Sequence, residues 1–161
     1  MTNWKNLIVA AICIAIPMAT GGLAGYITSD DSSGVWYQAL AKPAFQPPGW
    51  VFGPVWTTLY FLMGVGLFLV WRAPASRART AAMGLFGGQL VLNFFWSLIF
   101  FQWHLLGVAV AEIVLMWVAI VAMMVAFWRV RPVAAYLQIP YIAWVTFATV
   151  LTSAIYWLNR G

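Results

Sequence analysis

Polar side chains inside long apolar stretches are the residues of this sequence that could do chemistry. Gln89 and Asn93 lie one helical turn apart within "GGQLVLNFFW", and Glu112 is isolated in the apolar stretch near 105–128. An amide in hydrocarbon without a partner costs on the order of a few kcal/mol, so Asn93 must face a polar group, water or a ligand. The sequence leaves two roles open for Asn93: a hydrogen bond between helices, with Gln89 as a partner, or a contact with a ligand.

Glu112 is the only acidic residue that we predict inside the membrane. A carboxyl there is a functional candidate, and one alternative is that Glu112 carries protons in a small proton-coupled transporter. The favoured alternative is structural, because Glu112 lies about two turns from the turn near 102–104 and can reach the interface or pair with His104. No second carboxylate, histidine or thiolate accompanies it in the sequence, and no hydrolase or phosphate-loop motif is present. We therefore predict neither a metal site nor an acid/base pair.

Tryptophans supply a second kind of chemistry. The chain has eleven in 161 residues, more than aromatic belts at the membrane surface usually need. Trp56 and Tyr60 are spaced i, i+4 on one helix face, and Trp144 follows Pro140, which we expect to kink its helix and widen a cavity. Indoles in this arrangement favour a large, flat, apolar ligand with a polar edge, although any one of them can equally fill space in the bundle.

The stretch near 80–102 separates into two faces when it is placed on a helix at about 100° per residue. Gly84 and Gly88 form a G-x-x-x-G pair on one face. Gln89, Asn93 and Trp96 gather on nearly the opposite face, together with Ser97. The glycine face suits close approach of another helix, so we predict a homodimer interface there, with packing inside the same chain as the alternative.

The elements that must position these residues are membrane-spanning helices. The chain is 65% hydrophobic and 7% charged, whereas a soluble domain has about a quarter of its residues charged. Charged residues separate apolar stretches that are each long enough for a helix, which needs roughly 20 residues to cross about 30 Å of hydrocarbon. The stretches lie near 6–27, 50–71, 80–102, 105–128 and 133–157. We therefore predict a single all-α domain over 1–161, a five-transmembrane-helix bundle with a long loop at 28–49.

Basic residues predict the orientation in the bilayer. One face carries Lys5, the arginines at 72–79 and those at 129–131, whereas the other has only Lys42 and Arg160. Because basic residues concentrate on the cytoplasmic side, we expect a cytoplasmic N-terminus and an external 28–49 loop. The first stretch is longer than a signal-peptide core, so we expect it to be retained. The net charge of +5 comes from arginines and lysines that flank spans, so we predict no nucleic-acid partner.

One segment carries a specific pattern. "WYQALAKPAFQPPGWVFGPVWTTLY", from Trp36 to Tyr60, resembles the signature W-Y-x-x-L-x-K-P-x-x-x-P-P-x-W-V-F-x-P-x-W-T-x-L-Y of the TspO/MBR family, the tryptophan-rich sensory proteins related to the mitochondrial translocator protein. Two further blocks agree, "QLVLNFFWSLIFF" at 89–101 and "PYIAWVTFATVL" at 140–151. The resemblance covers the whole chain.

The resemblance implies a five-helix bundle, usually dimeric in bacteria, that binds porphyrins, haem and, in animal relatives, cholesterol and benzodiazepine-site drugs. A tetrapyrrole would be a ligand, and no cofactor would be required. The family pocket lies between the helices beneath the first loop, which acts as a lid. With the residues chosen above, the expected ligand-binding set is Trp50, Phe52, Trp56, Tyr60, Gln89, Asn93, Trp96, Trp144, Phe147 and Ala148.

Some relatives are reported to degrade protoporphyrin in light and oxygen, which makes Trp56 and Trp144 candidate catalytic residues of an alternative, enzymatic function. The chain departs from the family in its last block, which ends in Leu151-Thr152 where the family usually has Leu-Asn. Thr152 offers a hydroxyl in place of an amide. The residues from Leu151 through Tyr156 to Arg160 fit a loose sterol-contact pattern, for which we favour interfacial anchoring.

Overall fold

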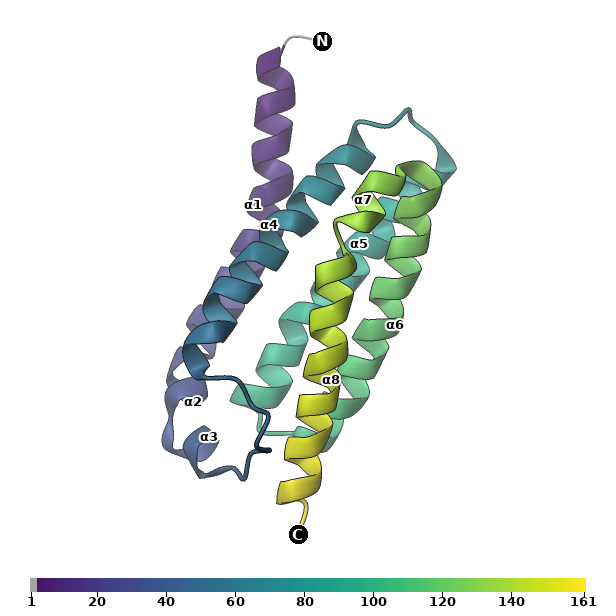
Figure 1. Ribbon diagram of the computed structural model, residues 1–161. Coiled ribbons are helices and arrows are strands. Elements are labelled where there is room, and N and C mark those ends of the chain that lie inside the picture. Colours follow the sequence, from purple (N-terminus) through teal and green to yellow (C-terminus); the bar gives the residue numbers. More distant parts are fainter. Residues whose placement is uncertain (1–2) are drawn as a thin grey trace.

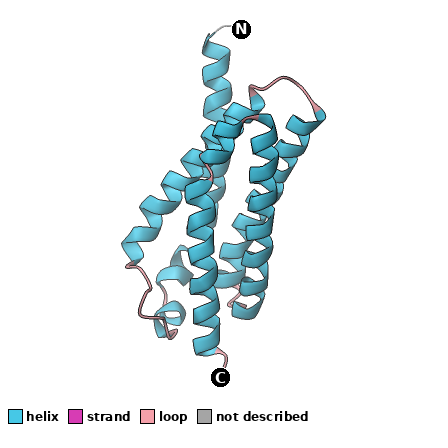
Figure 2. Ribbon diagram, turned by 45° about the vertical axis from the view of Figure 1, so that its right-hand side comes forward, coloured by secondary structure: helices cyan, strands magenta, loops and turns pink. Residues whose placement is uncertain are grey.

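The computed structural model describes residues 3–161, and within them it contains helices and no strand (Figures 1 and 2). Five helical stretches are long and apolar enough to cross a membrane. They are α1 (Asn3–Ile27), α4 (Phe52–Trp71, after the 3-10 turn Gly49–Val51), α5 (Arg77–Ser97, continued by the π-helical turn Leu98–Gln102), α6 (Leu106–Val130) and α8 (Ile139–Asn159, after the short α7, Pro132–Tyr136). The all-α, five-helix membrane architecture predicted from the sequence is confirmed.

Polar side chains satisfy backbone groups at the start of α5. It begins at Arg77 rather than near residue 80, because the Ser76 hydroxyl accepts a hydrogen bond from the backbone N–H of Arg79 at 3.1 Å. The Arg79 guanidinium turns back and donates to the carbonyls of Trp71 and Ala73, at 3.1 and 2.8 Å. Arg79, one of the arginines between the second and third spans, therefore also closes the turn between α4 and α5.

The segment that we expected to be a loop, 28–49, contains two short helices. They are α2 (Ser29–Ser33) and α3 (Val35–Ala39), separated by the extended backbone of Gly34. Irregular chain follows from Leu40 to Pro48, where prolines at 43, 47 and 48 cannot donate backbone hydrogen bonds. We call residues 28–51 the roof segment, because they cross one end of the bundle (Figure 1).

Pro140 does not kink a long helix, and that expectation is wrong. The chain ends α7 at Tyr136, passes through a turn, and begins α8 at Ile139, so that Pro140 lies in the first turn of α8. Proline is well tolerated there, because the first N–H groups of a helix have no partner within it.

Packing differs between the two ends of the bundle. Near α7 the helices are in close contact: Gly64 of α4 lies against the backbone of Ile14 in α1, and Gly66 lies against the side chain of Gln138. Phe127 is fully buried in the same region. Toward α3, by contrast, α4 and α8 diverge, and the roof segment lies at this end of the bundle (Figure 1).

Candidate functional site

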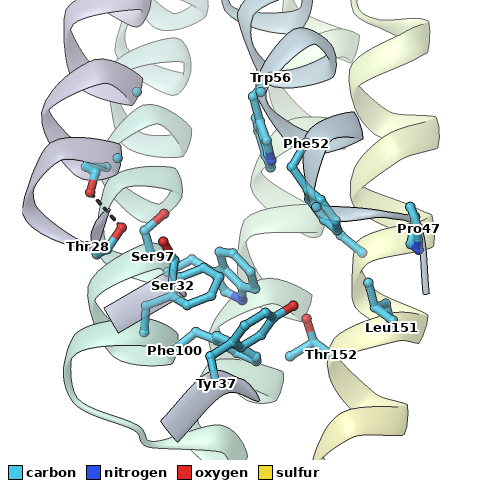
Figure 3. A pocket seen from close by; sticks show the side chains of 18 of the residues that line it. Thr28, Ser32, Tyr37, Pro47, Phe52, Trp56, Ser97, Phe100, Leu151 and Thr152 are labelled. Atoms are coloured by element: carbon cyan, nitrogen blue, oxygen red, sulfur yellow. Dashed lines mark hydrogen bonds between the residues drawn. The ribbon is translucent and has the colours of Figure 1, made fainter. Parts of the chain in front are cut away.

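A pocket of about 1040 Å³ lies beneath the roof segment, between α1, α4, α5 and α8. Figure 3 shows Phe52 and Trp56 projecting into it from α4, with Tyr37 of the roof segment and Phe100 closing its lower side. Its aromatic lining residues are Tyr37, Phe52, Trp56, Tyr60, Trp96, Phe100, Phe101 and Trp144. A cavity of this size is at the upper end of the roughly 300–1,000 Å³ usual for ligand sites, so it suits a large ligand.

Contacts between rings fix the positions of the aromatic side chains in the pocket wall. Trp56 stacks on Tyr60 with ring centroids 5.4 Å apart, and Trp96 stacks on Phe100 at 5.2 Å. The Tyr60 ring also lies against Gly21 of α1, where a Cβ would overlap it. These contacts hold flat aromatic faces along the cavity, which is the geometry that stacks a planar ligand.

A buried hydrogen-bond chain, here called the floor network, lies behind Tyr60. The Tyr60 hydroxyl donates to Asn93 Oδ1 at 2.6 Å, Asn93 Nδ2 donates to the Tyr141 hydroxyl at 3.0 Å, and that hydroxyl donates to Gln89 Oε1 at 2.7 Å. Asn93 and Gln89 are therefore joined through Tyr141 and do not bond directly to each other. Of the two roles left open for Asn93, the structure contains the interhelical hydrogen bond.

Polar contacts join the roof segment to α8 and hold it together internally. Asn159 of α8 exchanges two hydrogen bonds with the backbone of Ala41, each 2.9 Å long. The Lys42 ammonium donates to backbone carbonyls of α3 and its C-terminal end, among them that of Tyr37, and lies 4.6 Å from the Tyr37 ring centroid. Gln46 Nε2 donates to the Tyr37 hydroxyl at 3.0 Å. Partial burial raises the pKa of that phenol, which keeps it neutral.

The structure brings most of the predicted site residues to this pocket. Phe52, Trp56, Tyr60, Trp96, Trp144 and Ala148 line it. Gln89 and Asn93 lie behind the wall in the floor network, Phe147 lines a separate groove on the outside of the bundle, and Trp50 is 76% exposed and lines neither cavity.

Sequence reasoning missed the polar rim of the pocket. Thr28, Ser32, Lys42 and Gln46 line its roof side. The buried Thr152, which the departure from the family pattern had singled out, lines its wall. Lys42 and Gln46 lie within the segment from Trp36 to Tyr60 that resembles the family signature, so the resemblance could have identified them as site residues. The resemblance predicted that the 28–49 loop covers the pocket, but no motif in the sequence singled out the hydroxyls of Thr28 and Ser32.

Glu112 does not pair with His104, and that expectation is wrong. The His104 ring stacks on Trp36 at 3.8 Å between centroids. Glu112 is 9% exposed on the inward face of α6, and neither carboxyl oxygen has a hydrogen-bond partner among the described residues. A buried carboxyl without a partner is costly in hydrocarbon, so Glu112 remains a functional candidate.

Gly84 and Gly88 lie on the exposed face of α5. No atom of a neighbouring helix among the described residues lies within 4 Å of the position that a Cβ would take at either glycine. The structure therefore does not show the alternative to a dimer interface, in which this glycine pair packs against another helix of the same chain.

Known proteins share this sequence over most of its length. The model of the TspO/MBR family matches residues 13–158. The human translocator protein is 43% identical over 128 residues, which are 78% of this chain and 76% of the relative. The tryptophan-rich protein TspO of Chlorobaculum tepidum is 37% identical over 96% of this chain and 98% of its own, and the tryptophan-rich sensory protein of Cereibacter sphaeroides is 32% identical over 98% and 93%. The chain is a member of the TspO/MBR family.

Proposed function

We propose that this protein is a membrane receptor or sensor that binds porphyrins and related flat, hydrophobic ligands in the pocket beneath the roof segment. The observation that carries the proposal is the cavity of about 1040 Å³ walled by stacked indole and phenyl rings. The names of its relatives, translocator protein and tryptophan-rich sensory protein, agree with a binding or sensing role. Haem, protoporphyrin IX, sterols and benzodiazepine-site drugs are the ligands that the family suggests.

The distribution of polar groups fits an amphiphilic tetrapyrrole. The macrocycle would lie against Trp56 and Trp144, and its carboxylates would point to the rim, where Lys42 is the one cation among the lining residues. A carboxylate there would compete for the Lys42 ammonium with the carbonyls that now accept its hydrogen bonds. We propose that transport of the ligand uses the same site.

A dark titration tests this proposal. Protoporphyrin IX is added to purified protein in detergent, and quenching of tryptophan fluorescence is followed in wild type, Trp96→Phe and Trp128→Phe. Trp128 is an exposed residue of α6 outside the pocket, so its variant is the matched control. We expect saturable quenching in all three, with weaker binding only in Trp96→Phe; quenching that never saturates in wild type would refute the proposal.

A second candidate function is light- and oxygen-dependent degradation of a bound porphyrin. It is favoured by the presence of both Trp56 and Trp144 in the pocket wall. An excited macrocycle could take an electron from an adjacent indole, dioxygen would add to the reduced ring, and the electron would return to the indole, so that the net reaction is addition of dioxygen to the porphyrin. Illumination of the saturated complex separates the two functions. A receptor keeps its porphyrin absorption, whereas an enzyme bleaches it faster than denatured protein does and loses this activity in Trp56→Phe or Trp144→Phe.

A third candidate is proton-coupled transport, favoured by the unpartnered carboxyl of Glu112. Glu112→Gln keeps the shape of the side chain and removes its ionisable group. If the variant reconstituted in vesicles binds and moves ligand like the wild type, proton coupling through Glu112 is excluded.

We also propose that the protein is a homodimer through the Gly84/Gly88 face of α5 and that its N-terminus is cytoplasmic. The exposed glycine pair supports the first statement, and the distribution of basic residues supports the second. Gly88→Leu should convert the dimer to a monomer in detergent, as measured by light scattering, whereas Val118→Leu on the exposed face of α6 should not.

A further inference from the structure

We propose that the ligand enters and leaves the pocket sideways, from the hydrocarbon of the bilayer, through the gap between α4 and α8, and that the Trp144 side chain is the gate. This inference rests on the proposed function, because it concerns the route to the same site. It starts from a second cavity, a groove of about 540 Å³ on the outside of the bundle. Four residues of α4, among them Pro54 and Thr58, and four of α8, among them Ala143 and Phe147, line this groove.

Trp144 separates the groove from the pocket. Among the described residues it is the one that lines both cavities. Its ring meets Phe52 of the pocket wall edge-on at 5.7 Å between centroids and Phe147 of the groove at 5.4 Å. A change in the rotamer of this one side chain would therefore remove part of the barrier between the two spaces.

No polar contact holds the Trp144 ring in place. Its indole N–H is buried without a hydrogen-bond partner among the described residues, whereas the N–H of Trp117 donates to the Thr146 hydroxyl at 2.8 Å. Rotation of Trp117 would break a hydrogen bond, but rotation of Trp144 would break only ring contacts. The Trp144 side chain can therefore rotate without the loss of a hydrogen bond, which suits it to act as the gate.

The groove presents an apolar surface to lipid. Ala143 is exposed and small, and Thr58 donates its hydroxyl to the carbonyl of Pro54 at 2.9 Å, which leaves its methyl group as the available surface. The roof, in contrast, is joined to α8 by the two hydrogen bonds between Asn159 and Ala41. A hydrophobic ligand dissolved in the bilayer therefore meets a lower barrier at the groove than at the roof.

Rates of binding test the route independently of affinity. Wild type and Ala143→Phe are reconstituted in phosphatidylcholine vesicles, protoporphyrin IX is supplied in the membrane, and quenching of tryptophan fluorescence is followed in the dark by stopped flow. A phenyl ring in the groove should slow association and dissociation together, by roughly tenfold, with the equilibrium affinity unchanged. The matched control is Val150→Phe, which places the same ring on an exposed position of α8 outside both cavities.

Two further variants keep the inference testable if Ala143→Phe does not fold. Trp144→Ala should raise both rates, and Asn159→Ala, which releases the roof, should leave both within about twofold of wild type. Unchanged rates in Ala143→Phe together with faster exchange in Asn159→Ala would overturn the lateral route and indicate entry through the roof. Failure of wild type to bind at all would instead refute the proposed function, and the lateral route with it.

Discussion

Toward α7 the helices meet through glycines and fully buried side chains, whereas toward α3 the same helices separate around the pocket. At the α7 end, Gly64 and Gly66 bring α4 against the backbone of α1 and the side chain of Gln138. At the α3 end, rings stacked along the wall surround about 1040 Å³ of space. One helix, α4, thus runs from a packed region into a hollow one.

The floor network marks the boundary between these regions. Tyr60 contributes its ring to the pocket wall and its hydroxyl to Asn93, and Tyr141 continues the chain to Gln89. Buried polar groups that are fully bonded fix a single packing arrangement. The closely packed half of the bundle therefore holds in place the helices that surround the cavity.

The largest loss of stability is expected in the packed half. In Gly64→Ala the new Cβ would overlap backbone atoms of Ile14 and lie 2.9 Å from the Cys13 carbonyl oxygen, so α1 and α4 must move apart. We expect the free energy of unfolding to fall by about 1–3 kcal/mol. Gly53→Ala, at the start of the same helix with nothing near its Cβ, should be neutral or stabilising. Equal thermal stability of the two variants in detergent would contradict the account of this contact.

The next largest effect is expected in the floor network, which lies at the boundary between the packed and the hollow half. Asn93→Leu removes the acceptor of the Tyr60 hydroxyl and the donor to Tyr141, and we expect a loss of about 1–2 kcal/mol in unfolding free energy together with weaker porphyrin binding. Thr146→Val, which removes the hydrogen bond from Trp117 on the exposed side of the bundle, is the control and should leave binding unchanged. If Asn93→Leu affected stability alone, the network would not be the floor of the site.

In the hollow half, substitutions should affect binding more than folding. Trp56→Ala removes a ring that stacks on Tyr60 and meets Tyr141 edge-on at 6.4 Å, and we expect about tenfold weaker protoporphyrin binding, equivalent to about 1.4 kcal/mol. Trp103→Ala, at an exposed position outside the pocket, should bind normally. Titrations of tryptophan fluorescence measure both, and comparable losses in the two variants would show that the effect is not local to the wall.

The smallest effect is expected at the roof. Asn159→Ala removes both hydrogen bonds to Ala41 but no part of the aromatic wall. Backbone hydrogen exchange over residues 40–46 should increase, while ligand affinity changes by less than about twofold. A large loss of affinity would mean that the roof, rather than the wall, holds the ligand.

The sequence was sufficient for the spans and for much of the wall. Membrane-spanning helices end near charged residues, which the sequence shows directly. Residues spaced i, i+4, such as Trp56 and Tyr60, share one face of any α-helix. The aromatic residues chosen on that basis, and by the resemblance to the TspO/MBR family, line the pocket with the exceptions of Trp50 and Phe147.

The roles of the polar residues could not be read from the sequence. Helical phase shows that Asn93 and Gln89 face inward, but it does not show whether a ligand or a tyrosine from another helix faces them; here it is Tyr141. The closeness of Glu112 to the turn near 102–104 likewise left open whether it reaches the interface or pairs with His104, and the pairing is absent because neither carboxyl oxygen has a hydrogen-bond partner among the described residues. Contacts between segments far apart in the chain decide such cases.

A pocket-filling substitution tests the central claim most directly. Ala148→Trp places an indole inside the cavity, and Val150→Trp places the same indole on the exposed side of α8. Both variants and the wild type are titrated with protoporphyrin IX in the dark, after circular dichroism has established equal helical content. The account predicts saturable binding by wild type and Val150→Trp and loss of binding in Ala148→Trp. Unaltered binding by Ala148→Trp would place the ligand elsewhere and contradict the account.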